Sequence, residues 1–418
     1  MDTGTLNPNL IAAPHEVELS AKRLACISTT SQKFIDEKGL AGAVTVVARR
    51  GKIAYFEAFG TMDLEADKSM QRDTIFRIYS MTKPIAAAAV MMLCEAGKLH
   101  LDAPVSVYLP ELGGLKVGAD TDGELLTWVE ADRDMTVCDL MRHTAGLPGA
   151  ARYMAGQTPI DKRYREAGLH LLHECDLQEM VERLGRIPLL YQPGTKWHYS
   201  IAADVLGRLI EVTSGQPFDA FLAERIFQPL GMHDTGFYVP KEKIERFASM
   251  SGPKPEGGLQ TIDAPEGGTG HISKNSFTQK PKFLSAGGGL VSTATDFARF
   301  CLMLSDKGVL EGERLMTSES VELMTRNHLP EHLIPLDKKP DERYAGLGFG
   351  LGVSVRVKQT NWIPASQIGE YGWIGGASTE FWISPRDELV VITLAQHIPF
   401  SELSQTLKPL IYAAISKE

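Results

Sequence analysis

A run of ten apolar residues at positions 85–94 limits the fold of this 418-residue chain more than any other feature. The run contains four consecutive alanines, and no glycine or proline interrupts it before Gly97, so it favours a helix. Pro84 fits the first turn of that helix, where its missing N–H costs no hydrogen bond. The sequence therefore predicts a buried helix that begins near Pro84.

A serine and a lysine stand at the mouth of this predicted helix. Ser80 and Lys83 are three residues apart, which places both side chains on one face. A helix N-terminus also presents unpaired N–H groups and a partial positive charge to a developing anion. These groups together match the layout of an activated serine nucleophile, and the alternative is an N-cap serine beside a solvated lysine. Ser251 and Lys254 have the same spacing, but they lie among Gly and Pro with no helix to orient them, so we set them aside.

Composition describes an ordinary globular protein, in one elaborate domain or two sub-domains, with 43% hydrophobic and 23% charged residues. The net charge of −9 and the lack of a Lys/Arg run argue against a nucleic-acid surface. The start shows no signal-peptide pattern, and the longest apolar run is too short to span a bilayer. Five scattered cysteines without a Cys-x-x-Cys pair predict reduced thiols and a cytoplasmic protein.

Strand patterns occur at both ends of the chain, and helix patterns dominate its middle. We expect strands at residues 42–47, 53–59, 344–355, 370–374, 379–383 and 388–395. We expect helices at residues 17–38, 177–184, 202–213, 218–226 and 401–415, and a surface loop or active-site cover over 239–282.

This order predicts an α+β fold with a central antiparallel β-sheet completed by both chain ends, flanked by helices, and an adjoining mostly helical region. The predicted division is a sheet sub-domain from residues 1–83 and 284–418 and a helical sub-domain from 84–283. The active site is expected between them.

A tyrosine offers a second proton-handling group. Lysine is protonated near neutral pH unless its pKa is lowered, so Lys83 needs burial or a cationic neighbour to act as a base, and a second proton-handling group would help. Tyr199 stands at the N-terminal edge of the predicted 202–213 helix, after a Gln-Pro-Gly turn, where it can hold the pair and pass a proton to a leaving group. The alternative is a boundary tyrosine bonded to backbone. His198 is a rival base that we interpret as a spacer.

Glycines interrupt the predicted strand at 370–374 and the residues after it. Glycine inside a strand usually marks a place where another group approaches the backbone closely. A substrate carbonyl is one such group, and the N–H groups of Gly376 and Ser80 would then form an oxyanion hole. The alternative is a bulge without function.

Several motifs together resemble those of the serine β-lactamase-like superfamily, which includes class C β-lactamases, DD-peptidases and family VIII carboxylesterases. The matching motifs are Ser80-x-x-Lys83, Tyr199-Ser200, the stretch 139–148, the Gly-rich segment 285–293 and Trp373-Ile374-Gly375. The likeness runs from about residue 44 to 395. It implies Ser80 as nucleophile, Lys83 as its activating base, Tyr199 as partner acid or base, and oxyanion N–H groups from the serine's helix and from the strand of Trp373.

Two positions depart from the β-lactamase pattern. Ile201 replaces the asparagine of Tyr-x-Asn and offers no amide to a substrate, and Trp373-Ile-Gly375 replaces Lys-Thr-Gly. A tryptophan favours an apolar or aromatic acyl or alcohol portion. Trp373, Gly375 and Ile201 are the expected substrate-binding residues, and Trp-x-Gly resembles the family VIII esterases and related acyltransferases.

The sequence thus predicts a cytoplasmic serine carboxylesterase of the family VIII type that acts on small-molecule esters without a metal or cofactor. No Gly-x-Ser-x-Gly elbow or His-Glu-x-x-His motif is present. The alternatives within the superfamily are a weak β-lactamase and an acyltransferase, and outside it a non-catalytic binding protein of the same fold. The oligomeric state and the natural substrate do not follow from the sequence.

Overall fold

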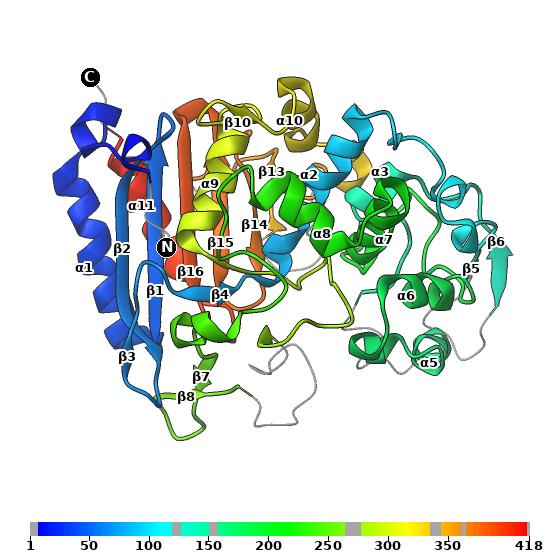
Figure 1. Ribbon diagram of the computed structural model, residues 1–418, viewed down its shortest axis with the longest axis horizontal. Coiled ribbons are helices and arrows are strands. Elements are labelled where there is room, and N and C mark those ends of the chain that lie inside the picture. The colour runs from blue at the N-terminus through cyan, green and yellow to red at the C-terminus, as the bar shows by residue number, and fades with distance from the viewer. Residues whose placement is uncertain are drawn as a thin grey trace.

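An eight-stranded antiparallel sheet runs through the protein, in the order β12-β13-β14-β15-β16-β1-β2-β3 (Figure 1). The computed structural model describes residues 7–118, 127–149, 158–263, 277–334, 344–360 and 365–415. The strands of this sheet are β1 Gly42–Arg49, β2 Lys52–Asp63, β3 Lys68–Ser69, β12 Leu347–Phe349, β13 Ser354–Arg356, β14 Tyr371–Gly375, β15 Thr379–Ser384 and β16 Leu389–Ala395.

Both ends of the chain build this sheet, as the sequence predicts. Strand β1 lies between β2 and β16, and Val44 pairs with Ala58 on one side and with Leu394 on the other. The single strand expected over 344–355 is wrong, because the chain turns back on itself there and forms the β12–β13 hairpin. Gly352 in that turn has φ +83°, a conformation that suits glycine and ends an extended strand.

Helices cover both faces of the sheet. Helices α1 (Ala21–Lys38) and α11 (Leu403–Ala413) pack on one face, while α9 (Ala294–Ser305) packs against β16 on the other (Figure 1). Strand β1 is buried along its whole length because its side chains alternate between the two layers. Val44 and Val46 belong to the larger core, and Ala43 and Val47 to the core beneath α1 and α11.

Helix α2 (Thr82–Glu95) forms the centre of the larger core. Its first twelve residues, 82–93, are all buried, so the apolar run is covered on every side. This confirms the predicted buried helix, which begins two residues before Pro84. Helices α7 and α10 pack against it. The remaining α-helices of the described residues are α3 Val137–Met141, α5 Pro159–Glu166, α6 Leu177–Leu184, α7 Ala202–Ser214, α8 Phe218–Leu222 and α10 Ser318–Thr325.

The other expected helices are also confirmed: α6 has the expected bounds, and the ends of the rest are shifted. Helix α1 begins at Ala21, capped by Ser20, because a 3₁₀ turn and an isolated bridge take up the residues before it. Helix α8 continues as a π turn, Ala223–Phe227. Short strand pairs complete the fold: β4 Ile75–Arg77 with β9 Val291–Thr293, β5 Lys116–Gly118 with β6 Trp128–Glu130, β7 Ser251–Pro253 with β8 Leu259–Thr261, and β10 Val309–Leu310 with β11 Glu313–Arg314.

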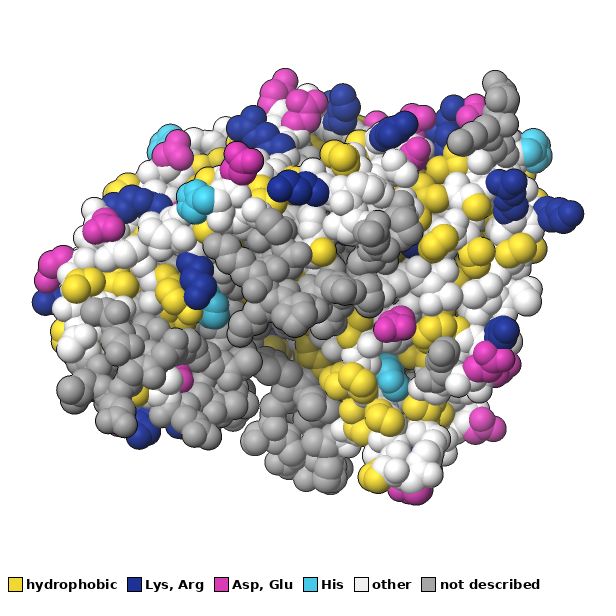
Figure 2. All heavy atoms as spheres, turned by 180° about the vertical axis from the view of Figure 1, so that it is seen from behind, with side chains coloured by type: hydrophobic (Ala, Val, Ile, Leu, Met, Phe, Trp, Pro, Cys, Tyr) yellow, Lys and Arg dark blue, Asp and Glu magenta, His cyan; other side chains and the backbone are white. Residues whose placement is uncertain are grey.

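The surface carries charges of both signs. On the face seen in Figure 2, Lys and Arg side chains stand among those of Asp and Glu instead of gathering in one area. All five cysteines are free thiols, and Cys175 and Cys301 are buried. Among the described residues, every helix is too short or too polar to cross a membrane.

Candidate active site

Ser80 lies in a strained turn between β4 and α2. The turn is a 3₁₀ turn, Tyr79–Met81, and Tyr79 has φ +43° although it is not glycine. Such a backbone conformation costs about 1–3 kcal/mol and persists only where the surroundings enforce it. The Ile78 N–H, which donates to the Leu290 carbonyl at 3.1 Å, is one such restraint. The turn leaves Ser80 partly exposed, so its hydroxyl is not sealed inside the core.

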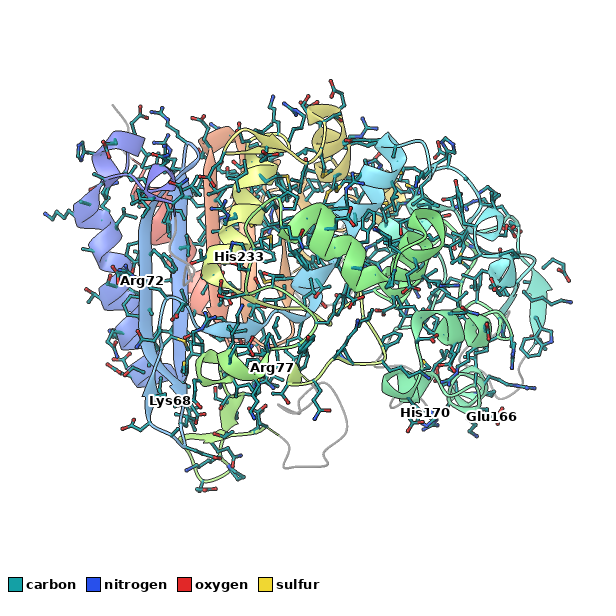
Figure 3. The ribbon with its side chains drawn as sticks, in the orientation of Figure 1. Lys68, Arg72, Arg77, Glu166, His170 and His233 are labelled. Carbon is teal, nitrogen blue, oxygen red and sulfur yellow. The ribbon has the colours of Figure 1, made fainter. Side chains whose placement is uncertain are left out.

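A buried arginine anchors the strand that leads to this turn. The Arg77 guanidinium, on β4, pairs with Asp263 at 2.5 Å and donates to Gln396 and to the Ala248 carbonyl. Figure 3 shows Arg77 between β4 and the segment that carries β7. Because the side chain of Arg77 is fully buried, its ion pair fixes the 239–263 segment beside the Ser80 turn. The loop expected over 239–282 therefore contains regular structure, a 3₁₀ turn and the β7–β8 pair, and its described part 239–263 is tied to the Ser80 turn.

Lys83 and Tyr199 both reach the Ser80 hydroxyl. Lys83 Nζ lies 3.1 Å from Ser80 Oγ, and Tyr199 Oη lies 2.5 Å from it, although Tyr199 is 119 residues away in the chain. Lys83 is only 5% exposed, and its Nζ also lies 4.4 Å from the centre of the Tyr199 ring. Its other contact is the Gly287 carbonyl, at 2.5 Å. The three residues expected from the sequence therefore share one site.

Aromatic side chains hold Tyr199 in place. Its ring packs against Trp373 and His143, with centroid distances of 5.4 and 4.7 Å, and Phe349 packs behind them against both. The Trp373 indole N–H points at Tyr199 Oη from 3.4 Å. The structure thus places Trp373, only 4% exposed, beside the tyrosine oxygen.

His143 is a site residue that sequence reasoning did not single out, although it lies in the matched stretch 139–148. Burial, followed by the nearby charges of Lys83 and His198, holds the pKa of His143 well below its usual range, so the ring is neutral at pH 7. Its Nδ1 accepts a hydrogen bond from the Ser200 N–H at 3.3 Å. His143 therefore fixes the backbone next to Tyr199. The His198 ring packs instead against Tyr191, 5.4 Å away.

The end of β14 packs against the Ser80 turn, Tyr79–Met81. A Cβ on Gly375 would lie 2.3 Å from the Ile78 carbonyl oxygen, so only glycine allows this approach. Gly376, the next residue, is exposed, and a Cβ there would meet nothing within 4 Å. The strand end that carries the Gly376 amide therefore lies beside the turn that carries the Ser80 amide.

Ile201 and Ser251, both singled out by their sequence motifs, are each fixed by hydrogen bonds of their own. Ile201 is 4% exposed, its N–H donates to the Pro148 carbonyl, and its side chain belongs to the larger core. Ser251, the second Ser-x-x-Lys serine, lies on β7 and is bonded to His397 and to the Gln396 carbonyl, with no helix behind it. In the described part of the chain, no three His, Cys, Asp or Glu side chains are grouped to hold a metal ion.

Comparison with known proteins identifies relatives along nearly the whole chain. A family model described as Beta-lactamase matches residues 27–412. Protein Rv1367c of Mycobacterium tuberculosis (strain ATCC 25618 / H37Rv) is 35% identical over 363 residues, which cover 86% of this chain and 86% of that protein. Esterase EstB of Burkholderia gladioli is 35% identical over 294 residues, covering 68% of this chain and 71% of EstB. The solved structure of EstCE1, described as a hydrolase with promiscuous acyltransferase activity, matches with a TM-score of 0.78 and 26% identity, covering 94% of this chain and 99% of that one.

Proposed function

We propose, from the premise that this chain belongs to the Beta-lactamase family, that it cleaves carboxylic esters through an acyl-enzyme on Ser80. The observation that carries the proposal is the convergence of Lys83 and Tyr199 on one partly exposed hydroxyl. The description of EstB as an esterase favours an ester over a lactam as substrate. Trp373 and Gly375, at the positions of a Lys-Thr-Gly motif, favour the family VIII carboxylesterase type.

In the proposed reaction, Lys83 in its neutral form accepts the Ser80 proton as Oγ attacks the ester carbonyl. The N–H groups of Ser80 and Gly376 stabilise the negative oxygen of the tetrahedral intermediate. Tyr199 passes a proton to the departing alcohol, which leaves an acyl group on Ser80. Water then attacks the acyl carbon by the reverse sequence of proton transfers and releases the acid.

The proposal extends to the surroundings of the site. We assign the active site to the boundary between the sheet sub-domain, residues 1–83 and 284–418, and the helical sub-domain, residues 84–283. Trp373 and Ile201 would shape the wall behind the substrate, and Gly375 would let the strand approach the turn. Five free thiols favour a reducing compartment, so we place the enzyme in the cytoplasm.

Mass spectrometry after treatment with a fluorophosphonate tests the nucleophile. The intact protein should gain one adduct, mapped to the peptide that contains Ser80, and should hydrolyse a short-chain nitrophenyl ester. Ser80→Ala should abolish both and leave the protein folded. Ser251→Ala is the matched control, because Ser251 has the same spacing to a lysine and should lose neither. An adduct elsewhere, or ester turnover by Ser80→Ala, contradicts the proposal.

Acyl transfer is the second candidate, because EstCE1 is described as having this activity. The acyl-enzyme would then be attacked by an alcohol in place of water. Product analysis with a competing alcohol should give a new ester in addition to the acid. A chromogenic cephalosporin, assayed beside the nitrophenyl ester, measures any β-lactamase activity.

A further inference from the structure

Asp204 lies beneath the site, on the first turn of α7 and five residues after Tyr199. Its side chain is buried, and one of its oxygens, Oδ1, accepts two hydrogen bonds. The donors are the Ser285 hydroxyl at 2.7 Å and the Gly287 N–H at 2.9 Å. Ser285 and Gly287 both belong to the Gly-rich segment 285–293. The Leu290 carbonyl of this segment accepts a hydrogen bond from the Ile78 N–H, just before the Ser80 turn.

The same segment supplies a contact of Lys83. The Gly287 carbonyl accepts a hydrogen bond from Lys83 Nζ at 2.5 Å. A neutral amine has two N–H bonds and one lone pair, so an N–H held by Gly287 leaves the lone pair able to face Ser80 Oγ. The position of the Gly287 carbonyl therefore decides whether Lys83 is aimed at the proton that it must accept.

Close packing shows how tightly this segment is fixed. A Cβ on Gly287 would lie 2.9 Å from Asp204 Oδ2, so the contact requires glycine. The segment turns back on itself through a bond from the Gly289 N–H to the Ser285 carbonyl. Beyond this turn, the Leu290 N–H donates to the Thr82 hydroxyl at the start of α2.

We propose that Asp204 is a positioning residue for Lys83, acting through the Gly287 carbonyl. Asp204 joins α7, the helix that follows Tyr199, to the segment that contacts Lys83. It therefore fixes the positions of Tyr199 and Lys83 relative to each other around Ser80. This inference rests on the proposed function, because it concerns the step in which Lys83 takes the Ser80 proton. Asp204 touches neither Ser80 nor the substrate in this assignment.

Steady-state kinetics with a nitrophenyl ester test the inference. Asp204→Ala should lower kcat by about 10–100-fold, the range expected when a reacting group is misplaced by about 1 Å, with KM within about threefold. Asp204→Asn keeps an oxygen in place for both donors and should restore kcat to within about fivefold of the wild type. Failure of the asparagine to restore activity contradicts a role in positioning.

Asp296→Ala is the matched control. Asp296, on α9, is also buried and also accepts one backbone N–H, from Asp234, and one hydroxyl, from Thr235. Neither of these donors belongs to the 285–290 segment that contacts Lys83. It should lose a similar amount of stability and keep its kcat. An equal loss of kcat in both alanine variants means that Asp204 is merely structural and overturns the inference.

A double-mutant cycle shows whether the effect passes through Lys83. The rate of fluorophosphonate labelling should fall with Asp204→Ala in the wild type, but not further in a Lys83→Ala background. Additive losses overturn the inference. If Asp204→Ala does not fold, Gly287→Ala replaces it as the test. The added Cβ would collide with the Asp204 carboxylate and displace the Gly287 carbonyl, and this variant should give the same loss of kcat. The wild type separates the two proposals, since absence of ester turnover and of a Ser80 adduct there refutes the proposed function itself.

Discussion

Replacing Tyr199 by phenylalanine removes one oxygen and keeps the ring. That oxygen lies 2.5 Å from Ser80 Oγ and 3.4 Å from the Trp373 indole nitrogen. The ring contacts Trp373, His143 and Lys83 Nζ, and phenylalanine preserves these contacts. The change therefore isolates the phenol as a proton donor and acceptor.

The expected loss follows from this role. Proton transfer by a positioned group contributes about 10²–10⁴-fold to a rate. At about 1.36 kcal/mol for each factor of ten, that range is about 3–5 kcal/mol of transition-state stabilisation. The loss should appear in kcat and kcat/KM together, because the phenol acts in the transition state. The free energy of unfolding should change by less than about 1.5 kcal/mol, the net contribution of one hydrogen bond.

Hydrolysis of a nitrophenyl ester, with thermal unfolding measured in parallel, gives both quantities. Tyr191→Phe is the matched control, since Tyr191 is a partly buried tyrosine that packs on His198 and Lys196 away from Ser80. It should retain kcat. A loss of less than about tenfold in Tyr199→Phe, or the same loss in the control, refutes general acid–base action by Tyr199.

Three further changes test the scaffold around the site. Gly375→Ala should lower activity and destabilise the fold by about 1–3 kcal/mol, because its Cβ would overlap backbone, whereas Gly376→Ala points into open space and should keep its stability; equal effects in activity and thermal unfolding contradict this geometry. Burial acts to raise the pKa of Asp139, but hydrogen bonds led by Arg133 lower it from 3.8 to about 2. About 2 kcal/mol of stability should therefore be present above pH 4 and lost as the pH falls to 2, and acid unfolding of Asp139→Asn should lack that loss. Asp263→Ala leaves Arg77 buried without its anion and should cost about 3–5 kcal/mol in denaturant unfolding, and a cost below about 1 kcal/mol contradicts the buried pair.

Much of the scaffold follows from local pattern. The apolar run at 85–94 predicts a helix inside the core, and α2 confirms it. The strands at both ends of the chain were predicted from alternation and turn residues, and their antiparallel pairing closes the sheet. The β12–β13 hairpin was missed because apolar residues continue through its glycine turn, so the pattern alone does not mark the reversal.

The site is less predictable, because its contacts join distant parts of the chain. Local spacing accounts for Ser80 and Lys83, but nothing local brings Tyr199 to them. Its place at the edge of a predicted helix made it a candidate proton-handling group, and the family resemblance implied its pairing with Ser80 and Lys83. The Lys83 contact at Gly287 is a carbonyl, which every residue carries, so no residue type marks it. Asp204 reads as an ordinary polar position in an amphipathic helix until its partners are known. The positive φ of Tyr79 is invisible to pattern, since tyrosine does not favour it.

The groups that contact Ser80 are positioned by elements of the hydrophobic core. Lys83 belongs to a helix whose first three turns are buried, so its backbone cannot move toward other groups. Other segments of the chain must therefore position the groups that contact its Nζ. Tyr199 is brought by the segment before α7, and the Gly287 carbonyl by the segment after the 239–263 region. Asp204, on α7, accepts a hydrogen bond from the second of these segments, so we infer that the distance between Lys83 and Tyr199 depends on one buried side chain. Substitutions that loosen α7 against this segment should therefore reduce acylation before they unfold the protein, because catalysis requires tighter geometry than folding does.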